Sequence, residues 1–116
     1  MIDDFVEQHR LLGNAVPKII NDYAAKLDSR RVTPAATPAE LERMFDEPLP
    51  EQGIPIEEIL RRFTEDIEPN AMGVPSPKYF GQFNPTPLPI GVWADALSSL
   101  LNQNWRVAQW SHIRND

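Results

Sequence analysis

Apolar side chains recur three, four or seven residues apart along the first quarter of the chain. This spacing places them on one face of a helix, and we predict a helix over residues 1–28. Pro17 lacks an amide proton and its ring collides with the preceding turn, which predicts a kink or a break there. The stripe fits either a core face or a seam against another chain, and consists of Phe5, Leu12, Val16, Ile19, Tyr23 and Leu27, with His9 between the first two.

Two short helices are predicted within residues 37–67. Thr37-Pro38-Ala39-Glu40 has the pattern of a capping box, with a threonine N-cap, proline at the first helical position and a glutamate reaching back. This helix is expected to stop before Pro48. The second helix carries an apolar stripe of Ile56, Ile59, Leu60, Phe63 and Ile67. Its other face predicts solvated ion pairs four residues apart, among Glu57, Glu58, Arg61 and Arg62.

Proline is frequent after Arg31, and the whole sequence contains 12 of them. Residues 68–87 are predicted to form a loop, which its aromatic residues indicate is ordered and packed. Residues 88–104 predict a last helix that is apolar over more than half of its circumference and therefore needs cover on two sides, before a tail at 105–116. Because no strand alternation is present, the predicted fold class is all-α, with about four helices and proline-rich connections.

Charge and composition exclude several classes of function. Eleven basic against 17 acidic residues give a net charge of −6, which argues against nucleic-acid and anionic-membrane partners. The chain has no cysteine, and His9 and His112 lie too far apart for a local metal motif. We therefore predict no metal ligands and no catalytic residues. No apolar run reaches the roughly 20 residues that span a bilayer, and Asp3 and Asp4 stand where a secretory signal carries basic residues, so a cytoplasmic chain is expected.

A long motif begins at Val74. It reads Val74-Pro75-Ser76-Pro77-Lys78-Tyr79-Phe80-Gly81-Gln82-Phe83-Asn84-Pro85-Thr86, followed by Pro89, Ala94-Asp95 and Leu101-Asn102-Gln103-Asn104. The motif resembles the N-terminal segment of the group II pyridoxal-phosphate (PLP) decarboxylases, which act on aromatic amino acids, glutamate and related amino acids. The resemblance covers roughly residues 1–104, and upstream it includes Val32-Thr33-Pro34 and Phe45-Asp46-Glu47-Pro48-Leu49-Pro50.

The resemblance implies a fold and a set of site residues. The chain would be the N-terminal helical segment of a fold-type I PLP decarboxylase, in an intertwined homodimer whose seam is the stripe on residues 1–28. The family's loop lines the mouth of the active site, which implies a substrate-pocket wall of Tyr79, Phe80, Gln82, Phe83, Asn84, Pro85 and Thr86. The following segment would reach the partner subunit's site with Asn104, Trp105 and Arg106.

The family's cofactor machinery has no match in this sequence. Its Schiff-base lysine follows a histidine in a large downstream PLP-binding domain, whereas Lys18, Lys26 and Lys78 do not follow a histidine. Lys78 is instead expected to be a solvated charge. The resemblance thus implies PLP in the complete family enzyme, no cofactor in this chain, and no activity of the chain alone.

Two functions fit these observations. In the first, the chain is the N-terminal part of a PLP-dependent amino-acid decarboxylase, a carboxy-lyase, and its partner is a second copy or the remainder of such an enzyme. In the second, it is a stand-alone helical adaptor derived from that family without enzyme activity. Binding of a small aromatic or carboxylated ligand in the Tyr79–Thr86 loop is a third, minor hypothesis.

Overall fold

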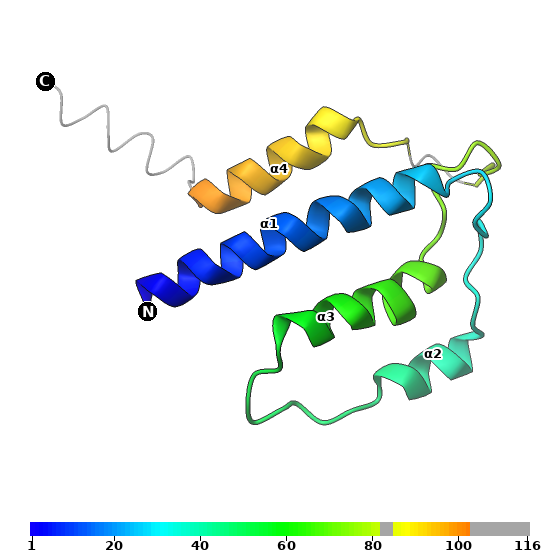
Figure 1. Cartoon of the computed structure of the whole chain (residues 1–116). Helices are drawn as coiled ribbons and strands as arrows, with labels where there is room; N and C mark the ends of the chain where they lie inside the picture. The colour runs from blue at the N-terminus through cyan, green and yellow to red at the C-terminus, as the bar shows by residue number, and fades with distance from the viewer. Residues whose placement is uncertain (82–84, 103–116) are drawn as a thin grey trace, which may run out of the picture. The chain divides into compact units, whose positions relative to one another are not determined.

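A computed structural model of the chain describes residues 1–81 and 85–102, and over these ranges all regular secondary structure is helical. This part of the chain contains four α-helices and no strand, and Figure 1 shows how the chain connects them. The prediction of an all-α chain with about four helices is therefore confirmed. The chain divides into two compact units, Met1–Asn84 and Pro85–Asp116, and each unit is described by itself.

Helix α1 spans Ile2–Ala25 and runs through Pro17 without interruption (Figure 1), so the predicted break does not occur. A proline inside a helix presses on the carbonyl group four residues earlier, and here that carbonyl belongs to Gly13. Glycine has the widest backbone freedom of any residue, so its peptide group can tilt away from the ring. The helix continues at the cost of the hydrogen bond that Pro17 cannot donate.

Helix α2 spans Pro38–Phe45 and begins with the predicted capping box. The backbone N–H of Glu40 donates to Oγ1 of Thr37 at 3.3 Å, and the N–H of Thr37 donates to Oε2 of Glu40 at 2.7 Å. The pKa of Glu40 lies below its ordinary value of 4.5. The larger cause is the hydrogen bond from the backbone N–H of Thr37, and the smaller cause is a hydrogen bond with the threonine side chain. The helix ends ahead of Pro48, as predicted.

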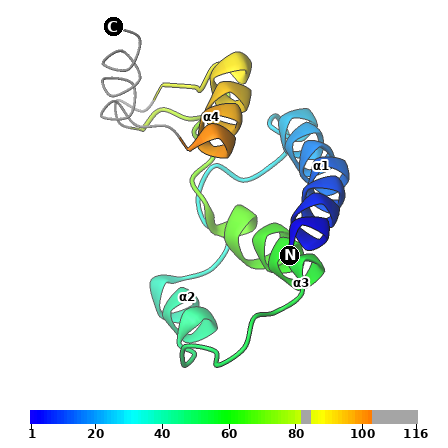
Figure 2. The ribbon, with the colours of Figure 1, turned by 90° about the vertical axis from the view of Figure 1, so that its left-hand side faces the viewer.

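Helix α3 spans Ile56–Arg62, and the chain changes its helical geometry directly afterwards. A π-helical turn, η1 (Phe63–Ile67), is followed by a 3₁₀ turn, η2 (Glu68–Asn70). The N–H of Glu68 donates to the carbonyl oxygen of Phe63, five residues earlier. Pro69 comes next and cannot continue an α-helical ladder, which accounts for a change of hydrogen-bonding pattern within the segment predicted as one regular helix. Figure 2 shows α2 and α3 as separate helices joined by the linker 46–55.

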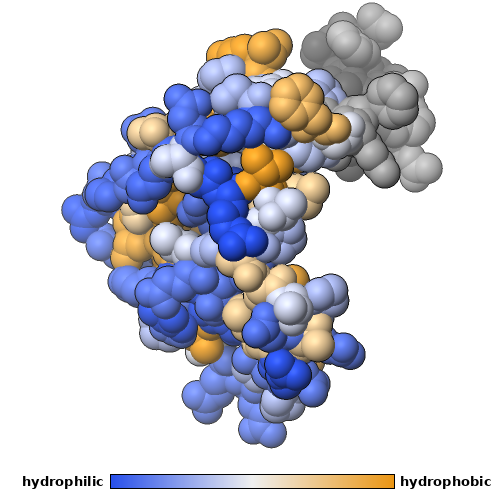
Figure 3. Space-filling model, turned by 90° about the vertical axis from the view of Figure 1, so that its right-hand side faces the viewer, coloured by the Kyte–Doolittle hydropathy of each residue, from blue (hydrophilic) through white to orange (hydrophobic). Residues whose placement is uncertain are grey.

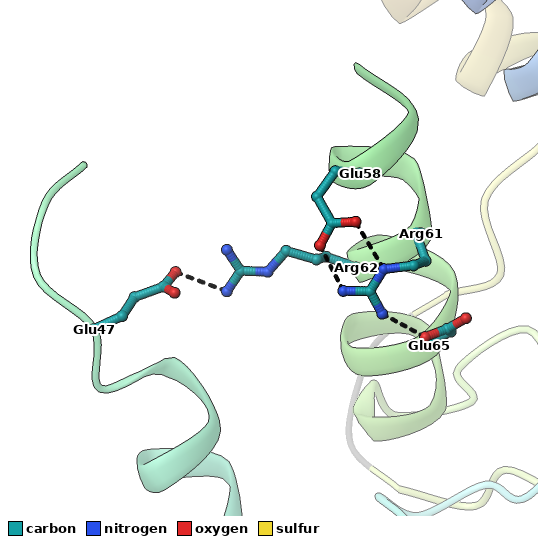
Figure 4. Close-up of polar contacts among 5 residues, drawn as sticks. All are labelled: Glu47, Glu58, Arg61, Arg62 and Glu65. Carbon is teal, nitrogen blue, oxygen red and sulfur yellow. Dashed lines mark hydrogen bonds and ion pairs between the residues drawn. The ribbon is translucent and has the colours of Figure 1, made fainter. Parts of the chain in front are cut away.

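The ion pairs on α3 differ from the predicted ones, as Figure 4 shows. Arg61 lies between Glu58, at 2.6 Å, and Glu65, at 2.5 Å, instead of pairing with Glu57. Hydrogen bonds from Arg61 lower the pKa of Glu58. Positions three and four apart are both neighbours on a helix, so spacing alone did not decide between these partners.

The second arginine of α3 makes a longer-range contact. Arg62 contacts Glu47, beyond the end of α2, at 2.7 Å (Figure 4), rather than Glu58 as predicted. Its side chain is only 26% exposed. The prediction of a purely solvated charged face is therefore wrong at Arg62, which joins α3 to the end of α2.

Helix α4 spans Pro89–Leu101 in the second unit, with a proline at its first position. It ends at Asn102, whose φ of 47° is left-handed and whose N–H donates to the carbonyl oxygen of Ser98 at 3.1 Å. Asparagine tolerates this conformation better than most residues. The large apolar side chains of α4 stay exposed, up to 74% at Ile90. The described residues of the second unit therefore do not bury the apolar surface of α4.

No large apolar side chain is buried among the residues that the structure describes. The one buried side chain there is polar, Ser76, at 5% exposure. On the face shown in Figure 3, hydrophobic residues lie at the surface among hydrophilic ones. Among the described residues of the first unit, therefore, the buried contacts are hydrogen bonds around Ser76 and not an apolar core.

Candidate functional site

In the first unit, hydrogen bonds connect two irregular segments that lie far apart in the sequence. We call residues 28–36, which follow α1, the strap, and residues 73–81, which follow η2, the aromatic loop. Hydrogen bonds join the strap to the segment 68–78, between residues 34 to 50 positions apart in sequence. The aromatic loop begins the motif from which the pocket wall was predicted, so these bonds set the position of the candidate site.

Arg30 connects the strap to α1 and to η2. Its Nη1 donates to the hydroxyl oxygen of Tyr23 at 2.7 Å, and its Cζ lies 4.6 Å from the centroid of the same ring. Its Nη2 donates to the carbonyl oxygen of Glu68 at 2.7 Å. A guanidinium group presents several donors in a fixed plane, so one side chain satisfies both partners. Tyr23, predicted for the dimer seam, thus also has a contact within the chain.

Asn70 holds the next part of the strap. Its Oδ1 accepts a hydrogen bond from the N–H of Ala36 at 2.9 Å, and its Nδ2 donates to the carbonyl oxygen of Asp66 at 2.7 Å. Beside it, the N–H of Ala35 donates to the carbonyl oxygen of Pro69 at 3.2 Å. Asn70 therefore satisfies an orphan carbonyl at the end of η1 and fixes the strap against it.

The strap and the aromatic loop approach most closely at Gly73. Its N–H donates to the carbonyl oxygen of Val32 at 2.7 Å. A Cβ atom at this position would lie 3.1 Å from Cα of Val32 and 3.2 Å from the carbonyl oxygen of Arg31. A side chain here would push the strap away by a few tenths of an ångström, whereas glycine lets the two backbones pack directly against each other.

The aromatic loop then makes two successive turns around Ser76. The N–H of Ser76 donates to the carbonyl oxygen of Gly73 at 2.9 Å, and the N–H of Tyr79 donates to the carbonyl oxygen of Ser76 at 3.0 Å. The buried hydroxyl oxygen of Ser76 accepts from the N–H of Lys78 at 3.2 Å. Nζ of Lys78 donates to the carbonyl oxygen of Asp28 at 2.6 Å. Lys78 is exposed, as predicted, but it is not merely solvated, since it binds the strap.

The predicted pocket-wall residues differ in their surroundings. Tyr79 is half-buried, and its ring lies over Gly81, where an added Cβ would come within 2.4 Å of the phenol oxygen. Phe80 is 92% exposed. Pro85 and Thr86 are exposed at the start of the second unit. Gln82, Phe83 and Asn84 lie outside the described residues, and so do Asn104, Trp105 and Arg106 of the predicted partner-site loop.

The predicted dimer seam lies along α1. Phe5 is 54% exposed and contacts His9 edge-on, with 4.4 Å between the ring centroids. The remaining seam residues are half-buried: Leu12, Val16, Ile19, Tyr23 and Leu27. The stripe is therefore partly covered within the chain and is most exposed toward the N-terminal end of α1, at Phe5.

The described residues do not form a site for PLP. A cofactor lysine must be desolvated to act as a neutral amine, whereas the side chain of Lys18 is 77% exposed and paired with Asp22 at 2.7 Å. The hydrogen bond from Lys18 lowers the pKa of Asp22. Lys78 donates to a backbone carbonyl group, and Lys26 is exposed. Nor do the described histidine, aspartate and glutamate residues gather into a group able to hold a metal ion.

Sequence reasoning missed the residues that hold the aromatic loop. Arg30 and Asn70 bind backbone carbonyl groups and a backbone N–H, and such partners leave no trace in a residue pattern. Gly73 carried a usable signal, since a glycine directly before the proline-rich motif is typical of a close backbone approach. Among the helices that the structure describes, none is long and apolar enough to cross a membrane.

Comparison with known proteins agrees with the resemblance in part. No family model matches the chain, and no solved structure matches it. Phenylacetaldehyde synthase of Petunia hybrida is 30% identical to the chain over 96 residues, which is 83% of the chain. The chain spans only 19% of that protein's length. The similarity supports a decarboxylase-like helical segment, related to part of an enzyme of the PLP decarboxylase type.

Proposed function

We propose that this chain is the N-terminal part of a PLP-dependent amino-acid decarboxylase-type enzyme, which contributes dimerisation and a wall of the substrate pocket and is inactive alone. The observation that carries the proposal is the 96-residue similarity to part of phenylacetaldehyde synthase. It agrees with the motif that starts at Val74, whose prolines and aromatic residues are in register with the family. The reaction and the substrate belong to the complete enzyme.

The aromatic loop has the properties that a pocket wall needs. A small-molecule site combines apolar walls with a few directed polar groups on a rigid support. Tyr79 is held by its own N–H and by the contact of its ring with Gly81, while Phe80 presents an almost fully exposed ring to a partner or ligand. Together with Phe83, which lies outside the described residues, these two residues would form the aromatic part of the wall in the assembled enzyme.

The exposed apolar side chains support the dimer. Soluble chains rarely leave large apolar patches uncovered, and the described residues include no buried apolar side chain. At the beginning of α1, Met1, Ile2, Phe5 and Val6 are all more than half exposed. A second copy that packs along the seam would cover this end of the helix.

Sedimentation of the chain at micromolar concentration tests the dimer. We expect twice the 13.2 kDa mass of one chain, and a monomer for Ile19→Glu, which places a charge in the seam. Gln8→Glu introduces the same residue at an exposed position of α1 and should leave the dimer intact. A monomeric wild-type chain would contradict the dimerisation role.

The size of the protein in its native source separates the enzyme from the adaptor. The proposal expects antibodies against this chain to recover a polypeptide several times larger than 13.2 kDa. The recovered material should contain PLP by mass spectrometry and release carbon dioxide from an amino acid. Recovery of a 13.2 kDa protein without PLP would instead favour the adaptor function.

A further inference from the structure

We propose that Lys78 is a positioning residue that holds the aromatic loop, with Tyr79, in a preformed conformation before any ligand or partner binds. The proposal rests on the proposed function for the role of Tyr79 in the pocket wall. Its structural content is independent of that role, because it concerns contacts within the first unit alone.

Two contacts with the strap bracket the six residues from Gly73 to Lys78. At one end the N–H of Gly73 donates to the carbonyl oxygen of Val32 at 2.7 Å. At the other end Nζ of Lys78 donates to the carbonyl oxygen of Asp28 at 2.6 Å. The first contact lies between two backbones, at a glycine whose missing side chain lets them approach. The second contact is made by the side chain of Lys78 alone, so a substitution at this position removes it.

The end of α1 is a favourable place for a cation, and Lys78 adds a second one there. α1 has no basic residue in its last turn, but Lys26 is its C-cap residue. The carbonyl groups at the end of a helix carry partial negative charge that a nearby cation stabilises. Asp28 lies in the turn that directly follows α1, and Lys78 brings an ammonium group to it from 50 residues away.

Tyr79 is the next residue after Lys78, so fixing Lys78 also restricts where the backbone of Tyr79 can lie. Its N–H is bonded to the carbonyl oxygen of Ser76, and its ring lies over Gly81. If Lys78 is held against the strap, the backbone of Tyr79 has little freedom left. A binding site that is ordered beforehand avoids the entropy cost of ordering a loop when ligand binds. The aromatic loop would therefore be preorganised when it contributes to the proposed pocket.

Amide hydrogen exchange of the full 116-residue chain tests this inference. In the wild-type chain we expect protection of the N–H groups of Ser76 and Tyr79. In Lys78→Ala both should exchange about fivefold faster or more, because the open state of a local structure becomes more populated when its contact is lost. Lys78→Arg, which can still donate to the carbonyl oxygen of Asp28, should restore most of the protection.

Two controls separate positioning from general destabilisation. Lys18→Ala removes the same charge from α1, where Lys18 pairs with Asp22, and should leave the Tyr79 amide unchanged. The amides of α3 serve as an internal reference in every variant. The inference is overturned if wild-type Tyr79 exchanges at the unprotected rate, if Lys78→Ala leaves it unchanged or accelerates α3 equally, or if Lys78→Arg behaves like Lys78→Ala. None of these outcomes depends on whether the complete protein is a decarboxylase.

Discussion

The backbone N–H of Ala36 donates a hydrogen bond of 2.9 Å to Oδ1 of Asn70, which lies 34 residues further along the chain. The same amide side chain donates to the carbonyl oxygen of Asp66. Asn70 thereby joins the strap to the end of η1 with both of its polar atoms. In a unit without a buried apolar side chain among its described residues, such contacts account for much of the order around the aromatic loop.

Asn70→Ala should loosen the strap at Ala36. The substitution removes the acceptor of the Ala36 N–H, and a lost hydrogen bond of this kind costs about 1 kcal/mol, or about fivefold in local exchange rate. Amide exchange measured by NMR gives this rate directly. The matched control is Asn14→Ala, at an exposed position of α1. Unchanged exchange at Ala36 in the Asn70 variant would show that this hydrogen bond does not hold the strap.

Acid should weaken the start of α2. The pKa of Glu40 is lowered in the folded chain, so the unfolded chain binds the proton first as the pH falls. The contribution of Glu40 to stability is therefore complete above its ordinary pKa of 4.5 and is lost as the pH falls through its lower folded pKa. Carbon chemical shifts of the Glu40 carboxyl group and of the α2 backbone, followed during an acid titration, should change together.

Two variants of Thr37 separate the causes of this pKa shift. Thr37→Pro removes both the N–H donor, which is the larger cause, and the hydroxyl group, so it should return the pKa of Glu40 to its ordinary value, and its difference from Thr37→Ala gives the effect of the N–H alone. The φ of Thr37 is −73°, which proline adopts without strain. Thr37→Ala keeps the N–H and removes only the hydroxyl group, so it should raise the pKa less. A larger increase in Thr37→Ala than in Thr37→Pro would contradict the assignment.

Helix α1 should gain stability from substitutions at Gly13 and Pro17. Pro17→Ala restores a hydrogen bond and relieves the ring contact, for a gain of up to about 3 kcal/mol. Gly13→Ala should add about 1 kcal/mol in helix propensity only together with Pro17→Ala, because in the wild-type chain the backbone freedom of Gly13 accommodates the ring of Pro17, although a Cβ there meets nothing within 4 Å. Circular dichroism during thermal melting should show more helix in Pro17→Ala and still more in the double variant. Gly53→Ala has the same free space but lies in the linker, and it should leave the helix signal unchanged.

The helices could largely be predicted from the sequence, because their determinants are local. The apolar spacing located α1 and α3, and the Thr37–Glu40 pattern identified the cap of α2. Each of these signals acts within three or four residues, the range over which helical hydrogen bonds form. Pro17 is the exception, since its effect depends on how the peptide group of Gly13 responds.

The candidate site could be predicted only in part. The sequence motif identified the aromatic loop, but the contacts that position it join residues 34 to 50 apart. Arg30, Asn70 and Lys78 bind backbone groups, which every residue possesses, so no pattern of residue types shows which ones they reach. In the same way Arg62 contacts Glu47 although Glu58 lies nearer in sequence.

The sequence by itself determined that the chain is helical, roughly where its helices lie, and which loop resembles a decarboxylase segment. Only the tertiary structure decided that Lys78 binds Asp28, that Gly73 packs against Val32, and that Arg30 connects Tyr23 to Glu68. The physical reason is the separation in sequence over which each kind of interaction acts. Helix propensity and capping act between neighbours along the chain, whereas these bonds form only after folding has brought distant backbone groups within reach.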